Sequence, residues 1–132
     1  SLKARLLDEL SSEVSAGING DTDSIYLFAL LRQALSENDS IENALTGITS
    51  ILRPLFGNEV RSLLNIVMSN GSKLFVTRHA INGDCPSLYY RVNDTGVTVA
   101  SEPLTNNDQW IKIGEHQLMI FNEQGPIDTL AL

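Results

Sequence analysis

The chain has 132 residues, of which 42% are hydrophobic and 19% charged, and this composition is typical of one globular domain rather than a disordered chain. Its net charge of −7 and its nine scattered Lys and Arg residues argue against a nucleic-acid partner, because phosphate affinity depends on clustered basic side chains. No apolar run approaches the roughly 18 residues of a membrane-spanning helix, and the single cysteine excludes an internal disulfide, so we expect a cytoplasmic protein with no membrane partner.

Apolar residues recur at helical spacing in the first part of the chain. Three helices are predicted, over residues 2–11, from about 23 to 35, and over 40–56. Either Asp39 or Ser40 can cap the third helix, since both side chains accept hydrogen bonds from the free backbone amides at a helix start. Pro54 and Gly57 are expected to help end it. Residues 1–57 are therefore predicted to form a helical part.

After residue 57 the apolar pattern becomes that of strands. Asn70 and Gly71 lie between two strand-like runs and predict a hairpin, since both residues tolerate positive φ at a turn. Leu74 and Val76 should then share one face of the second strand. Strands are predicted over 63–68, 73–78, 87–92, 96–101, 110–113 and 116–121. Residues 62–130 are expected to form six or seven mostly antiparallel strands, which makes the fold class α+β in a single domain over residues 1–132.

Cys85 lies in a turn-like loop and is the one thiol of the chain. A nucleophilic cysteine needs a nearby base, and neither His79 nor His116 stands at a recognisable triad spacing, so no catalytic residue is assigned. His79, Asp84 and Cys85 are metal-ligating residue types, but their spacing matches no common pattern and no metal is assigned. The sequence has no glycine-rich phosphate loop, and no cofactor is predicted.

Residues 20–24, Gly-Asp-Thr-Asp-Ser, place two carboxylates and two hydroxyls at the start of the second predicted helix. These side chains suit a helix cap, and negative charge at a helix start is favoured by about 0.3–1 kcal/mol. A cap needs only one of them, so a second carboxylate is left to face outward and pair with a ligand ammonium group. Residue chemistry leaves both roles open, and different residues can perform them.

Several short motifs, taken in their order along the chain, resemble those of a known protein family. They are Gly20-Asp21-Thr22-Asp23-Ser24, Ser69-Asn70-Gly71, Leu74-Phe75-Val76-Thr77-Arg78, Ser87-Leu88-Tyr89-Tyr90, Val99-Ala100-Ser101-Glu102-Pro103-Leu104 and Trp110. Their order and spacing resemble the class II glutamine amidotransferase domain of the N-terminal-nucleophile (Ntn) hydrolase superfamily. Within it, the stand-alone branch that includes the ergothioneine-pathway amidohydrolases is the most similar, and the resemblance covers nearly the whole chain.

The resemblance implies a four-layer αββα sandwich in which an N-terminal cysteine is the nucleophile and its α-amino group the base. It also implies an Asn-Gly oxyanion pair, an arginine for the substrate carboxylate, and an aspartate at a helix start for the substrate ammonium. Only this aspartate maps onto the chain, at Asp23, which leaves Asp21 or Thr22 as the cap. One departure is Ile25, where relatives carry a glutamate. The other implied groups would lie before Ser1, so this chain is expected to be the C-terminal portion of the domain.

Two functions follow from this interpretation. In the first, the parent protein is a glutamine amidotransferase or γ-glutamyl hydrolase that acts on glutamine or a γ-glutamyl small molecule, and this chain supplies Asp23 but is inactive alone. In the alternative, the chain is a non-catalytic binding or interaction module that retains the fold, which Ile25 in place of glutamate favours. An upstream reading frame that begins Met-Cys, with an Asn-Gly pair shortly before Ser1, would support the enzyme.

The half-domain interpretation also predicts partners for the sheets. If strands of an upstream half of the same domain complete each sheet, the chain alone should expose strand edges and inner-face residues, which recruit other chains. We therefore expect a homo-oligomer, a swapped assembly or a bound complementary segment. The residues expected to be bare are Leu74, Val76, Leu88, Tyr90, Val97, Val99, Leu118 and Ile120.

Overall fold

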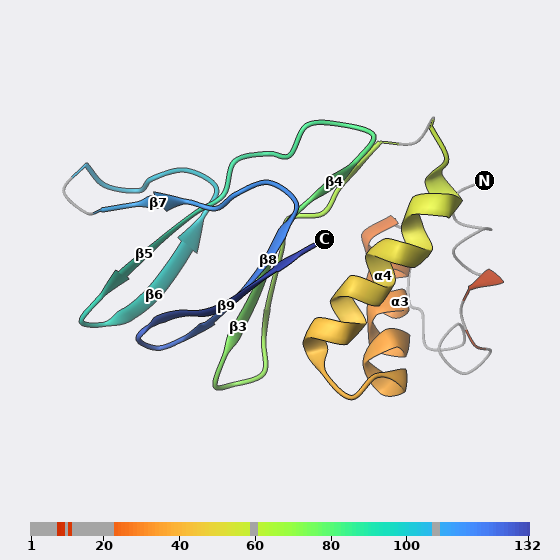
Figure 1. Cartoon of the computed structure of the whole chain (residues 1–132), viewed down its shortest axis with the longest axis horizontal. Coiled ribbons are helices and arrows are strands. Elements are labelled where there is room, and N and C mark those ends of the chain that lie inside the picture. The colour runs from red at the N-terminus through yellow and green to blue at the C-terminus, as the bar shows by residue number, and fades with distance from the viewer. Residues whose placement is uncertain (1–7, 10, 12–22, 59–60, 107–108) are drawn as a thin grey trace. The chain divides into compact units, whose positions relative to one another are not determined.

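The computed structural model describes residues 8–9, 11, 23–58, 61–106 and 109–132 (Figure 1). The chain divides into two compact units, Ser1–Asn58 and Glu59–Leu132, and each is described by itself. The helix predicted over residues 2–11 falls largely outside the described residues. The single domain over residues 1–132 stays a prediction.

Residues 23–58 of the first unit contain two helices, α3 (Asp23–Glu37) and α4 (Ile41–Phe56), as predicted. They contact each other and are joined by a three-residue connection. Ser40 caps α4, because its hydroxyl accepts a hydrogen bond from the backbone amide of Asn43 at 3.1 Å. Pro54 does not break the last turn, which continues to Phe56. No helix of the described residues is long and apolar enough to cross a membrane.

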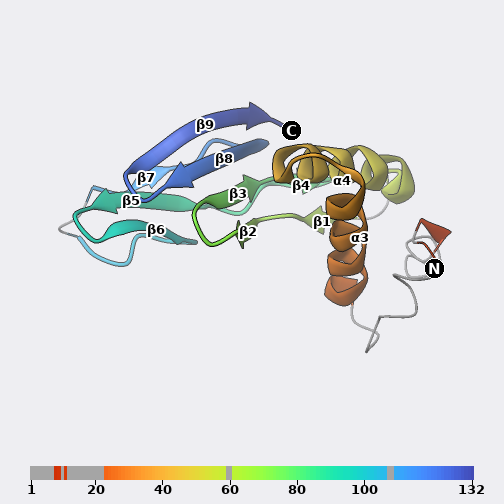
Figure 2. The same ribbon diagram turned by 90° about the horizontal axis from the view of Figure 1, so that it is seen from below.

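The second unit is made of antiparallel strands (Figure 2). The larger sheet has the order β2-β3-β8-β9, a second has the order β6-β5-β7, and β1 and β4 form a short pair. The strands are β1 (Ser62–Leu63), β2 (Ile66–Ser69), β3 (Leu74–Arg78), β4 (Ala80–Ile81), β5 (Tyr89–Asn93), β6 (Gly96–Ala100), β7 (Ile111–Lys112), β8 (Gln117–Asn122) and β9 (Gly125–Ala131). The α+β class with antiparallel strands is thus confirmed. The described residues hold nine strands rather than six or seven, and three of these have only two residues.

The predicted hairpin is present between β2 and β3, where Ser69 pairs with Leu74. The side chain of Asn70 organises the turn, since its Oδ1 accepts the backbone amides of Ser72 at 3.0 Å and Lys73 at 2.8 Å. Gly71 adopts a φ of 95°, which a residue with a side chain rarely adopts. The turn chemistry of the sequence therefore produces the hairpin locally.

The strand β9 was not predicted, because the sequence after Phe121 reads as a turn. Pro126 and Asp128 are both poor strand residues. Proline is tolerated here because β9 is an edge strand and the ladder with β8 shifts register at Phe121. Pairing with β8, rather than the local pattern, makes this segment a strand.

The two larger sheets pack face to face around a shared hydrophobic core. Its buried members are Val76, Leu88, Tyr90, Ile113, Met119 and Phe121, with Leu74, Val97 and Val99 partly buried against them. The rings of Tyr90 and Phe121 meet edge to face with centroids 5.0 Å apart. Leu74 and Val76 share this face of β3, as predicted.

This core corrects the expectation of bare inner faces. Val76 is 0% exposed and Tyr90 8% exposed, because strands of the two sheets within this unit supply both sides of the core. Leu118 and Ile120 are buried as well. What the described strands do leave unpaired is edges, along β2 and β9 in one sheet and β6 and β7 in the other.

Candidate functional site

Asp23, the substrate-binding residue of the sequence analysis, is the first residue of α3. The amides in the first turn of a helix lack partners within the helix, and the helix dipole favours negative charge there. Asp21 and Thr22, the two candidate caps, lie outside the described residues. The assignment of ammonium binding to Asp23 stays a prediction.

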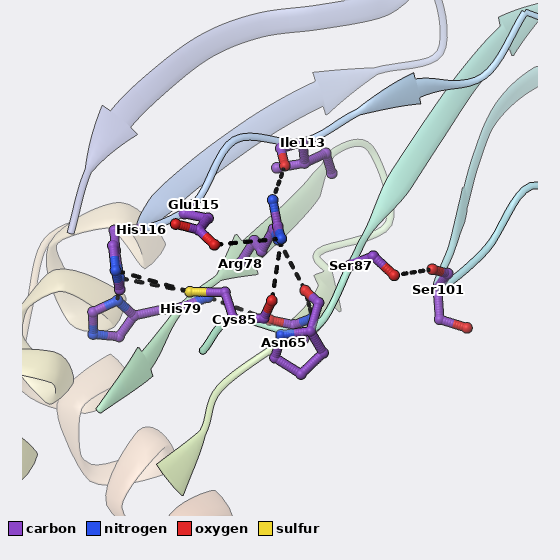
Figure 3. Close-up of polar contacts among 10 residues, drawn as sticks. Asn65, Arg78, His79, Cys85, Ser87, Ser101, Ile113, Glu115 and His116 are labelled. Carbon is purple, nitrogen blue, oxygen red and sulfur yellow. Dashed lines mark hydrogen bonds and ion pairs between the residues drawn. The ribbon is translucent and has the colours of Figure 1, made fainter. Parts of the chain in front are cut away.

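A second set of reactive side chains comes together within the Glu59–Leu132 unit. His79 follows β3, Cys85 lies in the loop between β4 and β5, and His116 directly precedes β8. The Cys85 Sγ lies 3.7 Å from Nδ1 and 3.9 Å from Nε2 of His116. The Nδ1 atoms of His116 and His79 are 2.9 Å apart (Figure 3). We call these three residues the thiol–imidazole cluster.

The distances in the cluster define two kinds of contact. At 2.9 Å the two Nδ1 atoms share a hydrogen, so one imidazole donates and the other accepts. The sulfur lies within 4 Å of both nitrogens of His116, so either nitrogen is within reach of the thiol. A thiol beside an imidazole that a third group orients is the arrangement of an activated nucleophile.

Burial and backbone conformation distinguish the members of the cluster. His79 is 1% and Cys85 7% exposed, whereas His116 is an exposed residue. His116 has a φ of 56°, in the left-handed region, where a residue with a side chain costs of order 1 kcal/mol or more. Its carbonyl accepts the backbone amide of Leu132 at 3.0 Å, which ties this strained residue to the end of β9.

Arg78 connects the two loops that carry Cys85 and His116. Its guanidinium donates from Nε to the carbonyl of Pro86 at 2.8 Å, from Nη1 to that of Ile113 at 2.6 Å, and from Nη2 to that of Cys85 at 3.1 Å. Arg78 is 5% exposed, and a buried cation is costly unless it is hydrogen-bonded. Three carbonyls offset that cost and thereby fix the two loops relative to each other.

Asn65 holds the remaining side of the cluster. Its Nδ2 donates to the carbonyl of Pro86 at 3.1 Å, and its Oδ1 accepts the backbone amide of His79 at 3.3 Å. The His79 carbonyl in turn accepts the amide of Leu64 at 2.8 Å. The backbone on either side of the cluster is therefore anchored to the segment between β1 and β2.

The spacing along the chain gives Cys85 no recognisable triad partner, yet the structure places His116 beside its sulfur. His116 lies 31 residues further along the chain, and only the pairing of β3 with β8 brings it close. The sequence held a signal for the histidine pair alone, because the predicted strands 73–78 and 116–121, once paired antiparallel, bring His79 close to His116. Asp84 is exposed, and no group of three His, Cys, Asp or Glu side chains among the described residues is arranged to hold a metal ion.

Three hairpin turns at another part of the same unit enclose a hollow of about 250 Å³. Its lining comes from the turns β2–β3, β5–β6 and β8–β9 and includes Lys73 and Glu123, one charge of each sign. The remaining lining is small, polar or apolar, including Phe121, and it holds no histidine or cysteine. This hollow supplies no acid–base pair, and the thiol–imidazole cluster is the chemically richer site.

Comparison with known proteins identifies the fold. No family model matches the sequence, and no curated protein matches it. Among solved structures, the chain is similar to the glutamine aminotransferase class-II domain protein from Silicibacter pomeroyi, with a TM-score of 0.82 and 24% sequence identity. The match covers 98% of this chain and 60% of that chain, so this chain spans 60% of that protein's length. The α+β architecture is therefore that of a class II glutamine amidotransferase-like fold.

Proposed function

We propose that the chain is the C-terminal part of a class II glutamine amidotransferase or γ-glutamyl amidohydrolase, in which Asp23 binds the ammonium group of the substrate. The observation that carries this proposal is the fold likeness, which extends over 98% of this chain but only 60% of its structural neighbour. The motifs between Gly20 and Trp110 also resemble those of this family. The position of Asp23 at the first residue of α3 is the position that the resemblance requires.

In this proposal the reaction is acyl transfer through a cysteine that lies upstream of Ser1. The thiolate attacks the γ-amide carbon, ammonia or an amine leaves, and water hydrolyses the resulting thioester. Asp23 contributes binding rather than bond cleavage. A carboxylate paired with the substrate ammonium holds the glutamyl group in register with the nucleophile, and such charged hydrogen bonds are stronger than neutral ones.

A second candidate is a non-catalytic binding or interaction module with the same fold. The feature in its favour is Ile25, an apolar residue two positions after Asp23, where members of the family that the chain resembles usually carry a glutamate. Ile25 is partly buried in α3. An apolar side chain at this position removes one charge from the region in which the substrate would be held.

The test is a glutaminase assay on the complete protein encoded by the gene, with glutamine and a γ-glutamyl anilide as substrates. Turnover that depends on an N-terminal cysteine and on Asp23 supports the enzyme. Absence of turnover with both substrates, in a protein that is folded by circular dichroism, supports the module instead. The 132-residue chain by itself is expected to be inactive in the same assay, and amidase activity that Cys85→Ser removes would contradict this.

A further inference from the structure

We propose that Cys85 is a reactive thiol that small hydroperoxides oxidise to the sulfenic acid, with His116 accepting the thiol proton and His79 holding His116 in place. This site is separate from the proposed amidase chemistry, which uses a cysteine outside this chain. Cys85 is the one cysteine of the 132 residues, so any thiol chemistry of the chain occurs there.

The proposal requires one tautomer of each histidine, since the Nδ1–Nδ1 contact fits donation in either direction. For His116 to take a proton from the thiol, its Nε2 must be unprotonated, and Nε2 lies 3.9 Å from the Cys85 Sγ. Its Nδ1 then carries the hydrogen and donates to Nδ1 of His79 across 2.9 Å. Once Nε2 is protonated, the same hydrogen bond to neutral His79 stabilises the imidazolium. His79 is thus a positioning residue.

The frame around the cluster keeps sulfur and base together. The Arg78 guanidinium donates to the carbonyls of Cys85 and Ile113, and it therefore links the loop of the thiol to the segment that leads into His116. Among the described residues, no three His, Cys, Asp or Glu side chains are arranged to hold a metal ion, and the proposal therefore concerns thiol chemistry.

The burial of Cys85 limits the oxidant to a small molecule. Cys85 is 7% exposed, so a peptide or a bulky disulfide would have little of the residue to reach, whereas a hydroperoxide is only slightly larger than water. In the step, sulfur attacks one peroxide oxygen, the S–O bond forms and the O–O bond breaks. The sulfur is oxidised by two electrons and the peroxide is reduced. The thiol proton passes through His116 to the leaving oxygen, so that thiol and hydrogen peroxide give sulfenic acid and water.

The experiment measures oxidation of the purified chain by hydrogen peroxide at pH 7, with dimedone as the trap and intact mass as the readout. The rate is measured in the native state and in urea, where the cluster is dispersed. Because His116 lies beside the sulfur as a proton acceptor only in the folded chain, we expect the native thiol to react about tenfold faster than the unfolded one. Cys85→Ser gives the blank.

Variants of His116 distinguish assistance of the oxidation by a base from an effect of the exposure of Cys85. His116→Asn suits the left-handed backbone, since asparagine tolerates positive φ, but it removes the base. We expect this variant to react no faster in the native state than in urea, and its rate in urea to equal that of wild type. The control Glu123→Gln, on an exposed turn residue, is expected to leave both rates unchanged. A native wild-type rate equal to or below the unfolded rate, or a native His116→Asn rate equal to wild type, overturns the proposal.

Two variants of His79 test its positioning role. His79→Gln retains an acceptor for the Nδ1 hydrogen of His116 and is expected to keep most of the native rate, whereas His79→Leu is expected to lose it. Native folding of each is checked by its urea transition. Equal native rates for the two folded variants would remove His79 from the proposal. If addition of Zn²⁺ alone raises the melting temperature of wild type but not of Cys85→Ser, the cluster binds metal and the thiol assignment is overturned.

Discussion

His79 and His116 face each other from the ends of two neighbouring antiparallel strands, with their Nδ1 atoms 2.9 Å apart. The register of the ladder explains the meeting, because Arg78 pairs with Gln117 and the two histidines are the next residues beyond that pair. The Arg78 side chain does not join the two imidazoles and instead donates a hydrogen bond to the carbonyl of Cys85. The end of the β3–β8 ladder thus positions the cluster and the frame that supports it.

Arg78 should be a large contributor to the stability of the strand unit. Arg78→Met keeps a long apolar stem but removes the guanidinium, so the buried carbonyls of Ile113 and Cys85 lose their donor. Each unsatisfied buried group costs about 1–3 kcal/mol, and we expect the free energy of unfolding in urea to fall by about 3 kcal/mol or more. Lys73→Met, on an exposed turn, is the control and should change it little. A similar stability for both variants would show that the carbonyl network contributes nothing.

The hairpin turn should require glycine at position 71. Gly71 has a φ of 95°, and an added Cβ would meet no atom within 4 Å, so conformational strain alone opposes the change to alanine. Gly71→Ala is expected to lower the free energy of unfolding by about 1–2 kcal/mol. Gly47→Ala is the matched control, since Gly47 lies inside α4 with open space and no positive φ. It should raise stability by about 0.5–1 kcal/mol, and changes of equal sign in thermal melts would contradict the argument.

The cap of α4 should be measurable by a single substitution. Ser40→Ala removes the hydroxyl that accepts the amide of Asn43, and loss of such a cap costs about 1 kcal/mol. Ser50→Ala makes the same chemical change at an exposed position inside the same helix, where alanine is the better helix former. Chemical denaturation of the two variants should therefore shift in opposite directions. A neutral Ser40→Ala would mean that water replaces the cap at no cost.

Asp23 should matter for binding more than for folding. In the complete protein, Asp23→Asn removes the charge that pairs with the substrate ammonium, and a charged hydrogen bond is worth roughly 1.5–3 kcal/mol. Since each 1.36 kcal/mol is tenfold in rate, kcat/KM for glutamine should fall by about 10- to 100-fold with little change in melting temperature. Asp39→Asn, at an exposed position between α3 and α4, should retain full turnover. Full turnover of Asp23→Asn would exclude the ammonium-binding role.

Patterns that act over a few residues were readable in the sequence. The apolar spacing of residues 23–35 and 40–56 predicts α3 and α4 because a helix is made by contacts three and four residues apart. The hairpin at Asn70 and Gly71 was equally local, since the turn residues themselves adopt the required φ and bind their own amides. The alternation of residues along β3 also predicted that Leu74 and Val76 share one face of the strand.

Features that depend on contacts between residues far apart in the sequence were decided only by the tertiary structure. The segment of β9 has no strand pattern of its own and becomes a strand by pairing with β8. Arg78 would be expected at the surface from its type, but three carbonyls, the farthest of them 35 residues along the chain, make its burial favourable. Cys85 and His116 meet for the same reason, because antiparallel pairing of β3 and β8 brings together loops whose spacing along the chain carries no sign of their contact.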